Sequence, residues 1–313
     1  EGKIDEFAVY DRELTQAEIT RMYNTYYSPN RVANGNFSQI GNEEVTNGDF
    51  SQIGSELVPS IASIENAGGG TITQISGNSY SSISDSTSGS GIRPKFDFAT
   101  TSGKTYKLVI TPTGTITGTV NFDFYDGSSY LFLNYDFTTT KEIYFTDNGS
   151  VFGAFDGTQT YNITGFTISI KEVGQDWTAD SNWTIDQANN KAISDGSQSG
   201  NVSLRQSNSI MGLTTGSFYK VEFTISNYSE GQINPHVRGN ASGNVSGDGV
   251  KTSYIAAGSG SDGINLYSNL DFAGDISNIS VKEVGQHWTF TNGWSVDDTK
   301  ATNDGTGGQI YPT

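Results

Sequence analysis

The sequence predicts an all-β protein of tandem antiparallel β-sandwich modules, with one short helix near the N-terminus. The first observation is a repeat: the segment from Ile168 to Thr178 returns almost unchanged from Ile279 to Thr289, 111 residues later, which is about the length of one compact domain. The second is composition, because Gly, Ser, Thr and Asn are abundant while Leu and Ala are scarce. The third is that apolar residues alternate with polar ones between turn residues, as half-buried strands require.

The alternation marks individual strands. We predict that the apolar members of each alternating set face a core and that turns separate the sets. The sets are Tyr106, Leu108 and Ile110; Phe122 and Phe124; Ile143 and Phe145; Phe166, Ile168 and Ile170; and Tyr219, Val221, Phe223 and Ile225.

The charge balance narrows the range of partners. Seventeen Lys and Arg against thirty-four Asp and Glu give a net charge of −17, which repels nucleic-acid phosphates and anionic membranes. We therefore expect no nucleic-acid partner, and neutral ligands such as sugars suit this surface. The chain has no cysteine, so neither a disulfide nor a thiolate metal site holds the fold. No apolar run approaches the roughly 20 residues of a membrane span, so no membrane insertion is expected.

Residues 1–30 differ from the rest of the chain. Ile4 to Tyr10 can form a strand, and Thr15 with Glu18 makes a capping box that opens a short helix. This pattern resembles the closing strand and helical turn of laminin-G-like, concanavalin-type lectin domains. The sheet that such a strand would close is not in this sequence. We therefore interpret residues 1–30 as the C-terminal remnant of an upstream lectin-like domain and carry no lectin activity over.

A short repeat follows. Asn-Gly-Asn-Phe-Ser-Gln-Ile-Gly at 34–41 returns as Asn-Gly-Asp-Phe-Ser-Gln-Ile-Gly at 47–54, and a period of 13 residues is too short for a domain. Asn-Gly is a tight-turn dipeptide, and the residues after it suit a short edge strand. Residues 31–46 are predicted to be a linker or duplicated strand, and the second copy to begin the first module.

The long repeat then sets the expected domain boundaries. We predict β-sandwich module 1 at 47–174 and β-sandwich module 2 at 175–285. Residues 286–313 repeat the beginning of module 2 and end before their strands could close a core, so they are predicted to be the start of a truncated third module. We expect the sequence to be a piece of a longer chain; the alternative is that its end borrows structure from a neighbour.

Four segments carry a resemblance to a known family. They are Asn47 to Phe50, Trp183 to Ile185, Tyr219 to Phe223 and Ile279 to Glu283. Their order and spacing resemble the jelly-roll carbohydrate-binding modules of the four-and-nine type. The joint Lys-Glu-Val-Gly-Gln-Asp-Trp is also similar to the joints between repeats in tail-fibre and other appendage proteins of marine tailed phages. The resemblance covers roughly residues 45 to 313.

The resemblance implies a jelly-roll sandwich with a groove lined by aromatic side chains and often a structural calcium ion. Many family members carry an aspartate near the closing strand, where this chain has Thr167 and Asn278. That departure leaves the calcium site open. Acidic turns such as 147–150 and 195–197 could offer oxygen ligands, but neither follows the spacing of a dedicated calcium loop. No cofactor is predicted beyond this possible calcium ion.

The densest aromatic stretch supplies the candidate sugar site. Rings offer broad apolar faces for a sugar, and carboxylate and amide groups nearby can hydrogen-bond its hydroxyls. A sandwich core with tyrosine tips would explain the same pattern. The candidate carbohydrate-binding residues are Tyr125, Asp126, Tyr130, Asn134 and Tyr135.

Four tryptophans recur in pairs six residues apart. They could form stacking platforms for a saccharide, or they could fill the core or the joint between modules. Repetition at a joint favours the second interpretation, and we predict core or inter-module positions. The residues are Trp177, Trp183, Trp288 and Trp294.

Catalytic signals are weak. No pair of carboxylates stands in a recognisable hydrolase motif, and His236 and His287 are far apart in sequence. The chain has no Gly-x-Ser-x-Gly elbow. We expect a binding or structural protein without catalytic residues.

Three hypotheses remain open. The resemblance implies a virion fibre of a tailed phage, at the virion surface or extracellular, whose modules bind host cell-surface polysaccharide. Its implied partners are further copies of the same chain, as a trimer, and other virion proteins. The first alternative is a purely structural spacer without sugar binding. The second is a set of accessory binding modules in a secreted bacterial polysaccharide-active protein.

Overall fold

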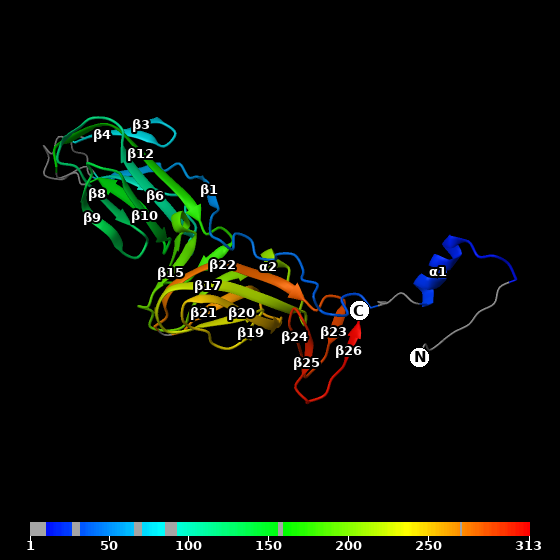
Figure 1. Cartoon of the computed structure of the whole chain (residues 1–313). Helices are drawn as coiled ribbons and strands as arrows, with labels where there is room; N and C mark the ends of the chain where they lie inside the picture. The colour runs from blue at the N-terminus through cyan, green and yellow to red at the C-terminus, as the bar shows by residue number, and fades with distance from the viewer. Residues whose placement is uncertain (1–10, 27–31, 66–70, 85–92, 156–158, 270) are drawn as a thin grey trace.

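A computed structural model describes residues 11–26, 32–65, 71–84, 93–155, 159–269 and 271–313 (Figure 1). The strand predicted from Ile4 to Tyr10 lies outside these residues. The described chain is all-β, as predicted, and its strands form antiparallel sheets. None of the helices in these ranges is long and apolar enough to cross a bilayer.

The predicted helix near the N-terminus is α1 (Gln16–Tyr26). The capping box is confirmed, because Thr15 N–H donates to Glu18 Oε2 at 2.9 Å and Glu18 N–H donates to Thr15 Oγ1 at 3.3 Å. The Arg12 guanidinium, followed by the Thr15 donors, lowers the pKa of Glu18 to about 2. Within the described ranges, the other helical segments are the single turn α2 (Asn208–Met211) and a 3₁₀ turn at Gln187–Asn189.

The first sandwich packs a seven-stranded sheet against a five-stranded sheet. Residues from both sheets form one hydrophobic cluster. The larger sheet has the order β10-β6-β12-β4-β3, with β1 and β7 also paired to β12, and the smaller has the order β2-β5-β11-β8-β9. Their bounds are β1 (Ile53–Glu56), β3 (Thr71–Ser76), β4 (Ser79–Ser84), β6 (Thr105–Pro112), β7 (Ile116–Gly118), β10 (Lys141–Thr146) and β12 (Tyr161–Val173), and β2 (Ser60–Glu65), β5 (Arg93–Asp97), β8 (Asn121–Tyr125), β9 (Tyr130–Asp136) and β11 (Phe152–Phe155).

The second sandwich packs two five-stranded sheets around a separate cluster. One sheet has the order β14-β15-β22-β17-β20 and the other β13-β16-β21-β18-β19. Their bounds are β14 (Trp183–Asp186), β15 (Lys191–Asp195), β17 (Phe218–Glu230), β20 (Gly249–Ala256) and β22 (Ala273–Val284), and β13 (Trp177–Ala179), β16 (Val202–Ser207), β18 (Ile233–Val237), β19 (Asn240–Ala241) and β21 (Asp262–Ser268).

Two hairpin pairings follow the second sandwich. They are β23 (Trp288–Phe290) with β26 (Ile310–Pro312), and β24 (Trp294–Val296) with β25 (Ala301–Asn303). A small cluster joins this segment to the second sandwich through Phe218, Val284 and Val296. Figure 1 shows the two sandwiches and then these red hairpins in succession along the molecule.

The predicted alternation is confirmed by burial. Tyr106, Leu108 and Ile110 are buried on β6, and every other residue of the five predicted sets is buried except Ile143, which is partly buried against the first core. Hydrophobic burial on both facing sheets therefore positions the strands, and the outer faces of the sheets stay available to solvent.

The edge strand predicted after each Asn-Gly turn does not begin at the phenylalanine. Each copy opens with a turn in which the asparagine and the phenylalanine have positive φ, at 48° for Asn47 and 56° for Phe50. The reason is local, since Asn47 Oδ1 accepts the N–H of Gln52 at 3.0 Å and holds the chain in the turn. Only Ile53–Glu56 of the second copy forms a short strand, β1, paired to β12.

Candidate functional site

An aromatic row crosses the outer face of the five-stranded sheet of the first sandwich. Tyr125 on β8 lies 5.2 Å from Tyr130 on β9 and 5.1 Å from Phe152 on β11, measured between ring centroids. Tyr130 and Phe152 are 6.2 Å apart and meet edge to face. Tyr130 is 45% exposed, while Tyr125 and Phe152 are half-buried. The row is thus a solvent-accessible patch of three rings from three strands.

Strand register produces this row. Phe122 and Phe124 point into the core, so their neighbour Tyr125 faces outward on the same strand. The ladder then places Tyr125 opposite Phe152 on one side and opposite Tyr130 on the other. Three rings that are far apart in sequence therefore become neighbours across the sheet.

Lys95 and Asp97 on β5 form an ion pair beside the Phe152 end of the aromatic row. Lys95 Nζ lies 4.8 Å from the centroid of Phe152 and 3.6 Å from Asp97 Oδ1. Such a cation over a ring face is favourable, and both charged groups can hydrogen-bond a polar ligand. Sequence analysis missed Lys95, Asp97 and Phe152, because no local motif marks strands that pair across long loops.

The other predicted residues of this stretch lie apart from the row. Tyr135 is opposite Phe122 and packs against the first core, and its hydroxyl lies 3.0 Å from Thr139 Oγ1. Asn134 is exposed and adopts a positive φ of 55°, and its backbone N–H donates to Asp123 Oδ1 at 2.6 Å. The structure therefore brings Tyr125 and Tyr130 together but not Tyr135.

Asp126 is buried in the turn that joins β8 to β9. Its Oδ1 accepts the N–H groups of Ser128 and Ser129 at 2.7 Å each. Burial raises the pKa of Asp126, but these donors outweigh burial, and the pKa is lowered. Asp126 thus fixes the turn that precedes Tyr130 and does not face the ring surface as a free carboxylate.

The tryptophans occupy cores and joints. Trp177 and Trp183 are each 2% exposed and belong to the core cluster of the second sandwich. Trp288 and Trp294 are half-buried. Trp294 also lines an open pocket of about 480 Å³ with Phe218 and Phe290.

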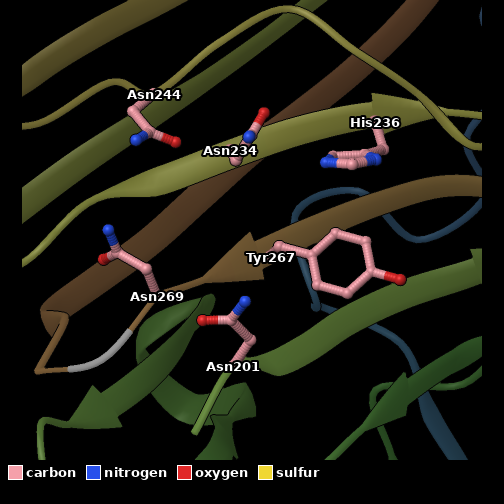
Figure 2. Close-up of a pocket in the computed structure, with 6 residues that line it drawn as sticks. All are labelled: Asn201, Asn234, His236, Asn244, Tyr267 and Asn269. Carbon is pink, nitrogen blue, oxygen red and sulfur yellow. The ribbon is translucent and has the colours of Figure 1, made fainter.

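A second candidate site lies on the second sandwich. Six side chains line an open pocket of about 440 Å³ over β18 and β21. Figure 2 shows the rings of His236 and Tyr267 on the same side of these strands, with four amide side chains beside them. The four amides are Asn201, Asn234, Asn244 and Asn269.

The polar groups of this pocket are partly organised by Gln232. Its Oε1 accepts Asn244 Nδ2 at 2.8 Å and Asn269 Nδ2 at 3.3 Å. Asn234 Oδ1 is buried and has no hydrogen-bond partner among the described residues. An unpaired buried acceptor is costly, so a donor that reached this oxygen would stabilise it.

His236 adds a ring to the amide pocket. It meets Tyr267 edge to face at 4.6 Å between centroids. Burial lowers the pKa of His236, which favours the neutral imidazole. The pocket therefore combines amides, which both donate and accept hydrogen bonds, with two rings and no full charge.

Among the residues that the structure describes, no three His, Asp or Glu side chains gather closely enough to share a metal ion. The structural calcium ion that the resemblance implies is therefore not assigned to any residue.

Comparisons with known proteins complete this description. No protein-family model and no curated protein matches the sequence. Among solved structures, the chain is similar to the N-terminal CBM22-1-CBM22-2 tandem domain of Xyn10C from Paenibacillus barcinonensis, at 10% identity and a TM-score of 0.24, over 74% of this chain and 98% of that one. At so low a TM-score the similarity decides neither ligand nor role, and the chemistry of the two sites carries the function.

Proposed function

We propose that this chain is a carbohydrate-binding protein whose two sandwiches hold neutral glycans on the outer faces of their five-stranded sheets. The observation that carries the proposal is the row of exposed Tyr130 and half-buried Tyr125 and Phe152, with centroids 5.1 to 6.2 Å apart. A sugar has an apolar face of C–H groups that packs against a ring, and its hydroxyls need donors and acceptors at the edge. Lys95 and Asp97 supply such groups beside Phe152.

The amide pocket supports the same chemistry on the second sandwich. Four asparagines offer donors and acceptors without charge, and Tyr267 and His236 offer ring surface. A neutral polyhydroxylated ligand matches this mixture better than an anion, because the net charge of the chain is −17. The two sandwiches therefore offer different sites, one mainly aromatic and one mainly amide.

We further propose that these sites work in a virion fibre of a tailed phage, at the virion surface, where they attach to polysaccharide of the host cell. The support is the tandem repeat and its Lys-Glu-Val-Gly-Gln-(Asp/His)-Trp joints, which resemble those of phage appendage proteins. In a trimeric fibre, weak sites repeated along and across chains would gain avidity without any strong single contact. Accessory modules of a secreted bacterial polysaccharide-active protein would use the same sites.

A structural spacer is the second candidate function. The observation that favours it is the burial of Trp177 and Trp183, which serve packing and offer no ring face to a ligand. A spacer would leave the aromatic row without a role, so binding measurements separate the two functions.

The test compares the full chain with Tyr130→Ala on arrays of neutral oligosaccharides and on purified bacterial surface polysaccharides, with and without calcium. Tyr311→Ala is the matched control, because Tyr311 is 46% exposed and Tyr130 is 45% exposed, and Tyr311 lies on β26 away from the row. We expect Tyr130→Ala to weaken binding about tenfold, equivalent to ~1.4 kcal/mol, and Tyr311→Ala to leave it unchanged.

Absence of binding by the full chain at any density of immobilised glycan would leave the spacer function in place. Binding that survives both Tyr130→Ala and Phe152→Ala but is lost in Asn234→Ala would move the glycan site to the second sandwich.

A further inference from the structure

The two copies of the short repeat dock in the same way on two different joints of the chain. In each copy, the asparagine Nδ2 donates to the backbone oxygen of the joint glutamine at 3.1 Å, and the joint tryptophan Nε1 donates to the asparagine backbone oxygen at 2.9 or 3.0 Å. The phenylalanine ring lies 5.4 or 5.5 Å from the indole. The residues are Asn34, Phe37, Gln286 and Trp288 for copy one, and Asn47, Phe50, Gln175 and Trp177 for copy two.

The other end of each copy repeats as well. A glutamate accepts the backbone N–H of a closing strand at 2.7 Å and a serine hydroxyl at 2.6 or 2.7 Å, and a lysine Nζ lies 3.8 or 3.9 Å away. These donors belong to β12 for copy two and to β22 for copy one. The groups are Glu43 with Ser280, Val281 and Lys282, and Glu56 with Ser169, Ile170 and Lys171.

Each copy of the short repeat therefore contacts both ends of one segment between modules: the end of a closing strand on one side and the tryptophan on the other. We call residues 34–56 the strap, and the segments 171–177 and 282–288 the first and second joints. Copy one, at 34–43, lies on the second joint, and copy two, at 47–56, lies on the first. Figure 1 shows the blue strap passing from the β23–β26 hairpin along the second sandwich to β1. The strap thus runs opposite to the order of the modules.

The shape of each joint, as well as its hydrogen bonds, restricts which residues the strap can carry. A Cβ on Gly41 would lie 3.2 Å from Glu283 Cβ, and a Cβ on Gly54 would lie 3.3 Å from Glu172 Cβ and from the Glu172 backbone oxygen, so a larger residue would crowd the joint there. Phe37 and Phe50 adopt positive φ of 57° and 56°, which a bulky residue rarely does without compensating contacts. The indole contact supplies that compensation in both copies.

We propose that each Lys-Glu-Val-Gly-Gln-(Asp/His)-Trp joint is a sequence-specific peptide-binding site whose ligand is Asn-Gly-(Asn/Asp)-Phe-Ser-Gln-Ile-Gly-Xaa-Glu. The two strap copies are interchangeable ligands, so the strap of a second copy of this chain can occupy a joint in place of the chain's own. The hydrogen bonds and the ring contact described above use the same atoms in both copies, which makes exchange between chains chemically equivalent to docking within one chain.

The experiment frees one joint in the full chain and adds the ligand separately. The released variant carries Asn34→Ala, Phe37→Ala and Glu43→Ala, and the probes are fluorescein-labelled peptides of residues 33–45 and 46–58, followed by fluorescence anisotropy. We expect both peptides to bind the released variant saturably. The intact chain should bind them at least about tenfold more weakly, because its tethered strap competes at high effective concentration.

Two controls test the contacts themselves. Peptides with both the phenylalanine and the glutamate replaced by alanine should not bind, and Trp288→Ala added to the released variant should abolish binding of the native peptides. Hydrogen exchange of β17 and β22 amides verifies that the second sandwich is folded in each variant. Failure of both peptides to bind a folded released variant, or equal binding to the released and intact chains, would overturn the proposal.

A second variant remains informative if the released variant does not fold. Within the shared motif the two copies differ at only two positions. Four substitutions therefore exchange the sequences of the two copies: Asn36→Asp, Asn42→Ser, Asp49→Asn and Ser55→Asn. Interchangeable copies predict an unchanged thermal midpoint for this traded chain. A lowered midpoint would show that each copy fits only its own joint, and would contradict the inference.

Discussion

Asp126 shows how a single buried carboxylate fixes a turn beside the aromatic row. Its Oδ1 accepts two backbone N–H groups and the Ser128 hydroxyl, and it is 6% exposed. A hydrogen bond to a charged group contributes roughly 1.5–3 kcal/mol to the stability of the folded protein. The turn that presents Tyr130 therefore depends on the ionised form of Asp126.

This dependence predicts a pH effect. The pKa of Asp126 is lowered in the folded chain from the ordinary value of 3.8, so its contribution is fully present above pH 3.8 and is lost as the pH falls through the folded pKa. We expect Asp126→Asn to be less stable than the unmodified chain at pH 7, by about 1–2 kcal/mol, and the difference to shrink below pH 3.8. Urea unfolding at pH 7, 4 and 3 measures it; a difference independent of pH would contradict the assignment.

Gly48 shows the opposite kind of constraint, in which the absence of a side chain matters. A Cβ at this position would lie against the backbone oxygen of Ile279, which cannot move as a flexible side chain would. We expect Gly48→Ala to destabilise the second sandwich by about 1–3 kcal/mol through overpacking. Gly200→Ala is the control, because nothing lies within 4 Å of its added Cβ. Equal urea midpoints for the two variants would mean that the strap shifts freely.

At the scale of the element, β1 depends on one glutamate. Glu56 accepts the N–H of Ile170 and the hydroxyl of Ser169, so it supplements the short ladder between β1 and β12. We expect Glu56→Ala to cost about 1–2 kcal/mol and to speed hydrogen exchange at the Ile170 amide. Glu142→Ala in the same sheet removes a partly exposed ion pair to Lys107 and should cost under about 1 kcal/mol. Unchanged exchange at Ile170 would show that this carboxylate contributes nothing to the edge.

The elements also show which parts of the fold the sequence could predict. The core strands could be predicted because alternation is local: Tyr106, Leu108 and Ile110 face the core on one strand whatever its neighbours are. The docking of the strap could not, because Asn47 and Phe50 contact Gln175 and Trp177, and these partners lie over a hundred residues away in the sequence.

The candidate sites divide in the same way. Tyr125 and Tyr130 could be predicted as neighbours, since a short turn joins their strands. Phe152 and Lys95 reach the row only through the register of β11 with β8 and β5. The amide pocket had no usable signal, because asparagine is common throughout this sequence and the pocket residues come from separate segments.

At the scale of the whole molecule, two hydrophobic cores are separate but touch at Tyr144. This residue lies on β10 of the first sandwich, where its neighbour Phe145 belongs to the first core, yet the Tyr144 ring packs against the core cluster of the second sandwich. Copy two of the strap crosses the same boundary, because Glu56 accepts a hydrogen bond from Ile170 of β12 and Phe50 packs against Trp177. The two sandwiches are therefore expected to unfold in a coupled manner, because Tyr144 of the first packs against the core of the second and the strap contacts both.

Removing the Tyr144 ring should weaken this coupling. We expect Tyr144→Ala to lower the stability of the chain by about 1–2 kcal/mol and to separate the unfolding of the two sandwiches in calorimetry. In the Tyr144→Ala background, Trp183→Ala should destabilise the second sandwich while amides of β6 and β12 keep their hydrogen-exchange protection. Tyr130→Ala deletes the same atoms from an exposed ring on the opposite sheet and should leave the coupling intact. If Tyr144→Ala and Tyr130→Ala gave the same single unfolding transition, the Tyr144 ring would not couple the sandwiches. The strap would then be the coupling element, and replacing Glu56 and Phe50 by alanine should separate the unfolding of the two sandwiches.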